Sequence, residues 1–210
     1  VVFTGGPGRE YVLTPLHKNI ADYWITGMGL DKADCRTLRS LPGVTGVQPR
    51  ITIEAQSTND SSRTLVLYAV PDTYDMNTPY LTKGALPASD RQVAISDEFA
   101  RANDLSVGDW YEMTLSGIDQ VLRVQISGLI KSPELIRHIT ATTPAADLSH
   151  YGFAYLNDTA LSTLMGANRY NQICLTVEEG TDDEILRRQI DEKLGDRAVN
   201  VLALKDSLAA

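Results

Sequence analysis

A strand–helix–strand pattern occurs twice in this sequence, once near each end of the chain, and it limits the possible folds more than any other feature does. The first copy covers residues 22–56 and the second covers residues 171–204. In each copy, apolar residues first recur at every second position, as in a strand, then at helical spacing, and then again at every second position. About a hundred residues, rich in strand patterns and turns, separate the two copies. This order predicts one lobe built from both ends of the chain, with a second lobe inserted between them.

Helix start and stop signals support both copies. The first helix is predicted to begin at Asp31 and to end before Pro42. In the second copy, Thr181 and Glu184 have the spacing of a capping box, and Gly195 is a typical C-terminal stop. Apolar residues at i, i+4 and i+8 predict a buried stripe on this helix, namely Leu186, Ile190 and Leu194.

Two shorter helices are predicted between these units. One follows Ser96, which is expected to cap it, and turns Phe99 and Ala100 inward. The other follows residues 157–158 and ends before Gly166.

Period-two alternation marks the strands. Apolar and polar side chains alternate in residues 51–56, 111–116 and 172–177, whereas residues 64–70 and 121–130 are more apolar on both faces. Such alternation is typical of mainly antiparallel sheets with one solvent-exposed face. The predicted fold class is therefore α+β.

The domain organisation follows from the order of these elements. We expect a lead-in segment at residues 1–19, one lobe from residues 20–70 and 150–210, and an inserted, mainly β lobe at residues 71–149.

Charge and hydropathy narrow the function classes. The net charge is −8 and the pI is about 4.8, so the surface repels phosphate backbones and we expect no nucleic-acid partner. No stretch reaches the ~18 apolar residues that span a bilayer. The sequence begins at Val1 without methionine and without the basic n-region of a signal peptide. We therefore expect a fragment of a longer protein.

Catalytic, cofactor and metal signatures are not found in the sequence. Its three histidines form no HExxH pair, no GxSxG elbow occurs, and the glycines near the start lack the Lys-Ser or Lys-Thr of a P-loop. Capping and solvation explain the carboxylates at residues 178–179 and 182–184. We expect no enzyme activity, no cofactor and no metal, although a hydrolase with an unrecognised site stays open.

The cysteines and tryptophans are expected in the core. Cys35 and Cys174 form no CxxC pair and are interpreted as small buried residues, although a disulfide between them stays open. Trp24 and Trp110 adjoin predicted strands, which favours packing over a role as stacking platforms for bases or sugars.

Two irregular stretches carry apolar residues that need a partner inside or outside the molecule. The candidate contacts with a partner or substrate are Leu135, Ile136, Ile139, Tyr74, Met76 and Tyr80. Packing of each loop onto its own lobe is the favoured interpretation. The alternative is a contact surface, since apolar residues displayed on loops often mark partners.

The order of these features resembles the extracytoplasmic domain, the MacB-like periplasmic core, of FtsX/MacB-family ABC transporter permeases. Residues 38–51 (LRSLPGVTGVQPRI) are similar to its first porter-type unit, in which a helix leads through Leu-Pro-Gly-Val to a strand. Residues 83–115 resemble its inserted, sabre-like lobe, with a Gly-x-Leu-Pro turn and a Val-Gly-Asp turn. Residues 124–134 are similar to the strand that follows and ends in Ser-Pro-Glu. Residues 151–166 and 170–194 resemble the closing porter-type unit.

The resemblance implies parts that this sequence does not contain. In that family such a domain lies outside the membrane, between the first and second of four transmembrane helices, and a cytoplasmic ABC ATPase supplies energy. The mode of action is mechanotransmission, in which ATP-driven closure moves the helices and the helices move the paired outer domains. The implied location is the cell membrane, with this domain on its extracellular or periplasmic side.

The implied partners are the chain's own transmembrane helices, the ATPase, a second permease copy or homologue, and an extracytoplasmic partner or exported substrate. The resemblance transfers no binding residue. One alternative of another class stays open, a secreted, free-standing ligand-binding or adhesion module of α+β type. Such a module would have a cleavable signal peptide and no later membrane span.

Overall fold

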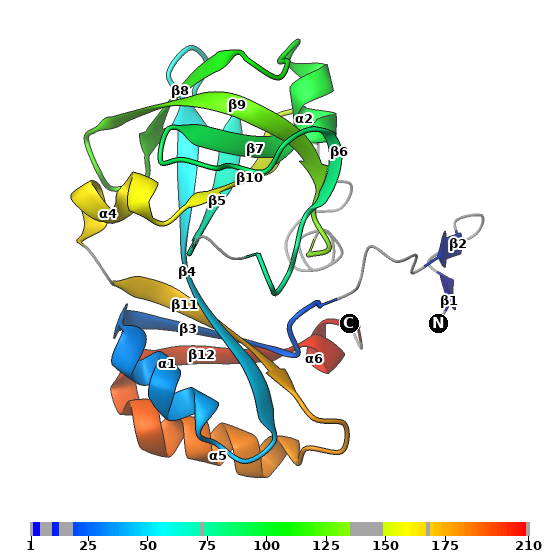
Figure 1. The fold of residues 1–210 in the computed structure, drawn as a ribbon, viewed down its shortest axis with the longest axis vertical. Helices are drawn as coiled ribbons and strands as arrows, with labels where there is room; N and C mark the ends of the chain where they lie inside the picture. Colours follow the sequence, from blue (N-terminus) through cyan, green and yellow to red (C-terminus); the bar gives the residue numbers. More distant parts are fainter. Residues whose placement is uncertain are drawn as a thin grey trace.

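The computed structural model describes residues 2–4, 10–12, 19–71, 74–134, 149–166 and 169–208. Beyond residue 18, the described residues form two stacked lobes that share one long strand, β4 (Val44–Ser57) (Figure 1). We call them the lower lobe and the upper lobe, after their positions in Figure 1. Separately, β1 (Val2–Thr4) and β2 (Glu10–Val12) form an antiparallel pair.

The lower lobe is an antiparallel sheet that packs against two helices. Its strands lie in the order β12-β3-β11-β4. Besides the first half of β4, its elements are β3 (Tyr23–Leu30), α1 (Lys32–Arg39), β11 (Tyr170–Val177), α5 (Asp183–Leu194), η2 (Gly195–Arg197), β12 (Ala198–Ala203) and α6 (Leu204–Leu208). The apolar stripes of α1 and α5 share one buried cluster with Ile25, Ile173 and Leu175 of the sheet. Burial of this sheet face therefore depends on the two helices.

The upper lobe is a sheet that closes on itself. Its pairings run β4-β5-β10-β7-β9-β8 and return from β8 to β4, and closure removes the unpaired edges of the ring. Its other strands are β5 (Thr64–Val70), β6 (Tyr80–Gly84), β7 (Gln92–Ser96), β8 (Trp110–Leu115), β9 (Val121–Lys131) and β10 (Tyr151–Asn157). Its helices are α2 (Asp97–Ala102) and α4 (Thr159–Met165). β6 adds to β9 outside the ring.

The strand β5 is buried on both of its faces, as expected from the apolar residues on both faces of the segment 64–70. Leu65 and Leu67 point into the main core, whereas Val66 and Tyr68 lie in a second cluster with Tyr155 of β10. The pairings of β5 with β10 and of β7 with β9 are parallel, although all the other pairings are antiparallel. Apolar side chains are therefore buried on both faces of the sheet at β5, in two separate clusters.

The predicted helices and strands are present, within one or two residues of their expected bounds for most elements. The first helix begins at the predicted place and is capped by Asp31: the Asp31 carboxylate accepts hydrogen bonds from the N–H groups of Ala33 and Asp34, and the Asp34 side chain accepts one from the Asp31 N–H. This reciprocal capping box satisfies N–H groups that have no partner within the helix.

Two predicted caps are wrong. The helix α5 is capped by Asp182, which accepts from the Ile185 N–H at 3.0 Å, whereas the Thr181 hydroxyl donates to the Glu178 carbonyl. Ser96 makes no capping bond to α2, because its hydroxyl accepts instead from the Phe153 N–H of the neighbouring strand at 3.3 Å. In each case a nearby acceptor or donor competes with the helix end for the hydroxyl.

The boundary between the lobes differs from the predicted one. The strand β4 changes sheets in its middle, since Arg50 pairs with Gln172 in the lower lobe and Ile51 pairs with Ala69 in the upper lobe. β5 in turn pairs with β10, so residues 51–70 and 151–157 belong to the ring rather than to the lobe made from both chain ends.

Candidate functional site

The predicted contact residues do not form one surface in the described part of the chain. Leu135, Ile136 and Ile139 lie outside the described residues. Tyr80 is 55% exposed and lies on β6 beside Leu81, which is 37% exposed. Among the described members of the predicted contact set, Tyr80 is the exposed one.

Tyr74 and Met76 pack inside the molecule. Tyr74 is partly buried against the second cluster of the upper lobe, which contains Val66 and Tyr155. Its hydroxyl donates to Asn157 Oδ1 at 3.2 Å. Met76 is buried against Trp24 and Cys174 of the lower sheet. Tyr74 thus packs on its own lobe, as in the favoured interpretation, whereas Met76 packs on the other lobe and attaches this segment to the lower sheet.

A buried polar network lies where β4 passes from one sheet to the other. We call it the junction network and define it by Trp24, Arg50, Tyr68, Glu134, Tyr155 and Gln172. Trp24 of β3, Arg50 of β4 and Gln172 of β11 come from the lower lobe. The other three come from the upper lobe, where Glu134 follows β9. The network therefore joins segments of both lobes.

Arg50 uses its whole guanidinium group in this network. Its two terminal nitrogens donate to the two oxygens of Glu134 at 2.7 and 2.8 Å, which is a bidentate pair. Its Nε donates to Gln172 Oε1 at 2.6 Å. The guanidinium carbon lies 4.4 Å from the centre of the Tyr68 ring, within the range of a cation–π contact.

Glu134 receives hydrogen bonds from two further side chains. Trp24 Nε1 donates to Oε1 at 2.7 Å, and the Tyr155 hydroxyl donates to Oε2 at 2.8 Å. Arg50 and Glu134 are only 2% and 1% exposed. Since a buried charge is tolerated only when it is paired and hydrogen-bonded, these contacts explain how the chain can bury both ions.

The environment fixes the charge states of the network. Burial alone would lower the pKa of Arg50, but the neighbouring acidic groups Cys174 and Glu134 hold that pKa well above its ordinary value. Burial, and then the charge of Glu134, raises the pKa of Tyr155 well above its ordinary value. Tyr155 is therefore a neutral donor to a charged pair.

Sequence reasoning missed this network. Arg50 stands between Pro49 and Ile51 in a strand whose alternation continues through it, and Glu134 belongs to a Ser-Pro-Glu segment that resembles a family motif. The two residues are 84 positions apart. The available signal was a charged residue, Arg50, inside a strand with buried neighbours. That signal does not show that Glu134 is its partner.

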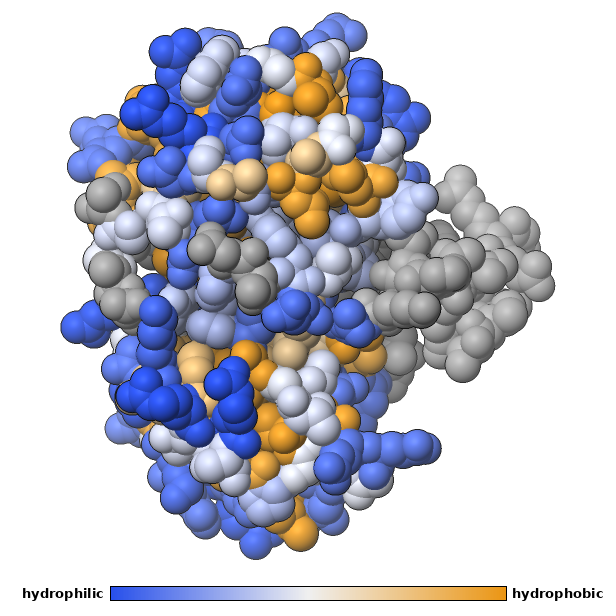
Figure 2. Space-filling model, viewed as in Figure 1, coloured by the Kyte–Doolittle hydropathy of each residue, from blue (hydrophilic) through white to orange (hydrophobic). Residues whose placement is uncertain are grey.

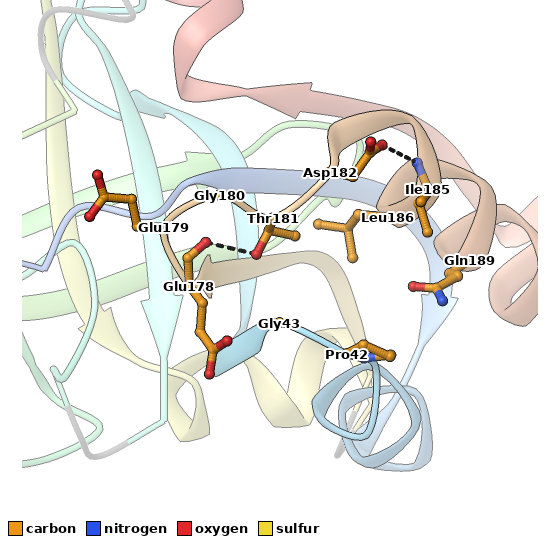
Figure 3. A pocket seen from close by; sticks show the side chains of 10 residues that line it. All are labelled: Pro42, Gly43, Glu178, Glu179, Gly180, Thr181, Asp182, Ile185, Leu186 and Gln189. Atoms are coloured by element: carbon orange, nitrogen blue, oxygen red, sulfur yellow. Dashed lines mark hydrogen bonds between the residues drawn. The ribbon is translucent and has the colours of Figure 1, made fainter.

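A shallow hollow of about 320 Å³ lies beside the turn that leads into α5 (Figure 3). Pro42, Ile185 and Leu186 line it together with the carboxylates of Glu178 and Asp182. As predicted for this cluster, the Asp182 carboxylate is a helix cap. The hollow therefore has an apolar floor and an acidic rim.

The remaining predicted features have mixed outcomes. Cys35 and Cys174 are both free and buried. Trp24 is buried, but the prediction for Trp110 is wrong, because it is 49% exposed and its ring faces the guanidinium of Arg123 at 4.9 Å.

Within the described ranges no group of three or more His, Cys, Asp or Glu side chains could hold a metal ion. None of the described helices is long and apolar enough to cross a membrane.

Comparison with solved structures identifies the fold, whereas no family model and no curated protein matches the chain. The periplasmic region of MacB from Actinobacillus actinomycetemcomitans superposes with a TM-score of 0.54 at 14% sequence identity, covering 93% of this chain and 98% of that one. This chain has the fold of the MacB periplasmic region. The extracellular domain of the ABC-type transporter YknZ from Gram-positive bacteria is equally similar, with a TM-score of 0.54, 14% identity, and coverage of 88% of this chain and 99% of that one.

The MacB-like fold confirms the α+β class and the resemblance that the sequence features indicated. In both comparisons the solved domain is matched over nearly its whole length. The similarity therefore includes the lower lobe and the upper lobe together and is not limited to one common motif.

Proposed function

We propose that this chain is the extracytoplasmic domain of an ABC transporter permease of the mechanotransmission type, placed on the extracellular or periplasmic side of the cell membrane. The observation that carries the proposal is the nearly complete match with two domains of that location, at 98% and 99% of their lengths. Fold alone does not imply function, so the proposal also needs support from the geometry of this chain.

The geometry that supports it is the position of the two ends of the lower lobe. β3 and β12 are antiparallel neighbours, and Tyr23 pairs with Ala203 at one end of the sheet. The Leu204 N–H donates to the Asp22 carbonyl at 2.8 Å. The chain thus enters and leaves the lobe at adjacent points (Figure 1). This arrangement suits a domain inserted between two consecutive membrane helices, because both helices would connect to the domain at the same end of its sheet.

In this proposal the domain does no chemistry, needs no cofactor and transmits movement. A cytoplasmic ABC ATPase would drive the transmembrane helices that flank the domain. Their displacement would reach the paired strands β3 and β12 first and then the upper lobe through β4. The domain would act beside a second copy or a homologue, and its upper lobe would contact an exported substrate or an extracytoplasmic partner, with Tyr80 and the segment that contains Leu135 as candidate contacts.

The reading frame that encodes this chain gives the first test. The proposal expects one apolar span of about twenty residues before Val1 and three such spans after Ala210. A cleavable signal peptide before Val1 with no later span would contradict it and favour a secreted binding module.

A functional test uses the whole permease with its ATPase in lipid nanodiscs. Spin labels at the exposed positions Asp119 and Glu192, one in each lobe, report the distance between the two copies of the domain. We expect the distance distribution to change when ATP is added and to return after hydrolysis. The isolated chain, mixed with ATP, is the control and should neither change nor hydrolyse ATP. ATP turnover by the isolated chain, or no distance change in the whole permease, would contradict the proposal.

A further inference from the structure

We propose that the junction network fixes the orientation of the two lobes, so that they move as one rigid body. The covalent connections alone do not ensure this. Among the described residues the chain passes between the lobes along β4 and between β10 and β11. A few residues at such a crossing can absorb a large backbone change and act as a hinge. Arg50 and Ile51 stand at this crossing, because there the partners of β4 change.

Each member of the central ion pair is held by its own lobe. Gln172 of the lower lobe accepts from Arg50 Nε at 2.6 Å. In the upper lobe, Tyr155 donates to Glu134 Oε2 at 2.8 Å, and Ser132 Oγ accepts from the Glu134 N–H at 3.1 Å. Each ion is therefore held by a contact within its own lobe in addition to the ion pair.

Within the junction network, four contacts cross from one lobe to the other. Two are the bidentate bonds between Arg50 and Glu134, at 2.7 and 2.8 Å. The third is the bond from Trp24 Nε1 to Glu134 Oε1, and the fourth is the cation–π contact of Arg50 with Tyr68. Planar bidentate pairing restricts both the distance and the angle between its partners. Rotation of one lobe against the other would disturb all four contacts at once.

Burial makes such a rotation unfavourable. Arg50 and Glu134 are almost completely inaccessible to solvent, so water cannot replace a broken contact without opening the junction. Removing one buried charge from its partner costs much more than breaking an exposed pair. The network therefore selects one arrangement of the lobes.

Rigidity has a consequence for the proposed function, and this consequence alone rests on that function. A displacement applied to the lower lobe would be carried undiminished to the upper lobe. A loose junction would instead absorb part of the displacement by bending.

The test is a comparison of residual dipolar couplings of the 210-residue chain, measured separately for the amides of the two lobes. In the unmodified chain one alignment tensor should fit both lobes. In the double variant Arg50→Met with Glu134→Leu, which removes both buried charges and keeps similar volumes, we expect two tensors, with a smaller magnitude for one lobe. Replacing a buried ion pair by apolar residues preserves folding in other proteins, so the double variant should fold.

A matched control removes a pair of the same geometry within one lobe. Arg197 donates to both oxygens of Asp34 at 2.7 Å, and both residues belong to the lower lobe. The double variant Arg197→Met with Asp34→Leu should keep one common tensor. Two tensors in the unmodified chain, or one common tensor in the Arg50–Glu134 double variant, would overturn the proposal.

A milder variant keeps the test decisive if the double variant does not fold. Trp24→Phe removes one of the crossing contacts without removing a charge, and it should lower the tensor magnitude of one lobe. Unchanged couplings in that variant would overturn the proposal as well. In the whole permease, the Arg50–Glu134 double variant should lose transport but keep ATP hydrolysis. If the chain is rigid but the parent protein is not a permease, the lobe inference stands and the proposed function fails.

Discussion

The two lobes bury their apolar surfaces in different ways, although they share one strand. In the lower lobe, α1 and α5 pack on a sheet and begin at local capping residues. In the upper lobe the sheet closes into a ring, and the helices α2 and α4 are short. Figure 2 shows the apolar surface on one face as separate patches over both lobes rather than one continuous area.

This difference separates local from non-local causes of structure. A helix-covered sheet can be recognised from caps and periodicity, because both signals lie within a dozen residues. A closed ring depends on pairings such as that of Leu67 with Ala154, which lie far apart in the sequence. The boundary between the lobes was therefore the part of the fold most open to error.

The largest expected effect is at the junction, where the two lobes depend on the same contacts. Glu134→Gln keeps the shape of the side chain but leaves the buried Arg50 without a counter-charge, so we expect a loss of about 3–5 kcal/mol in the free energy of unfolding. Urea denaturation followed by circular dichroism and by tryptophan fluorescence checks it. If the network unites the lobes, the two probes give one coincident transition in the unmodified chain.

An exposed ion pair provides the control for this prediction. Glu112 and Arg123 lie 3.4 Å apart and are 49% and 62% exposed. Glu112→Gln should change the unfolding free energy by at most about 1 kcal/mol. Equal losses in Glu134→Gln and Glu112→Gln would show that the junction pair has no special role.

The next effect tests the packing of the upper lobe alone. A Cβ atom at Gly152 would lie 2.7 Å from Ser96 Oγ and 2.8 Å from Phe99 Cβ, so Gly152→Ala should overpack the contact between β10 and α2. We expect a loss of about 1–3 kcal/mol. Hydrogen exchange should increase for the amides of the upper lobe, with the amides of α5 as internal control. An increase no larger near Gly152 than in α5 would contradict the expected local effect of the overpacked contact.

A smaller effect compares the helix starts of the two lobes. Asp31→Ala removes the capping box of α1 and should cost about 0.5–2 kcal/mol, with faster exchange of the Ala33 and Asp34 amides. Ser96→Ala should cost about 0.5–1.5 kcal/mol through the lost bond to Phe153, and exchange in α2 should stay unchanged. Faster exchange at the start of α2 would show that Ser96 does cap that helix in solution.

The last effect is absent at neutral pH, because it is confined to alkaline pH and to the lower lobe. Burial, and then the hydrogen bond to Asp183, raises the pKa of Tyr23 from 10.0 to about 12. Between these values the tyrosine ionises in the unfolded chain but keeps its proton in the folded one, so the stability it contributes is complete below pH 10 and falls as the pH rises. Tyr23→Phe should make this decline shallower in denaturation curves measured from pH 9 to 12. Identical slopes in both proteins would contradict the expectation.

The sequence by itself determined the local elements and their order. Caps, stop signals and periodicity located α1, α5 and the four strands of the lower lobe. The long strand-rich stretch between the two strand–helix–strand units predicted an inserted lobe. The candidate contacts were found less well. Met76 is apolar and lies in an irregular stretch, and nothing in that pattern tells a buried anchor from an exposed contact.

Only the tertiary structure decided the closure of the ring, the change of sheet within β4, and the meeting of Arg50 with Glu134. The physical reason is that strand pairing and ion pairing join any two segments that the fold brings together, and the free energy of such a contact depends on burial. Burial is a property of the whole packed molecule, whereas a helix cap is complete within four residues.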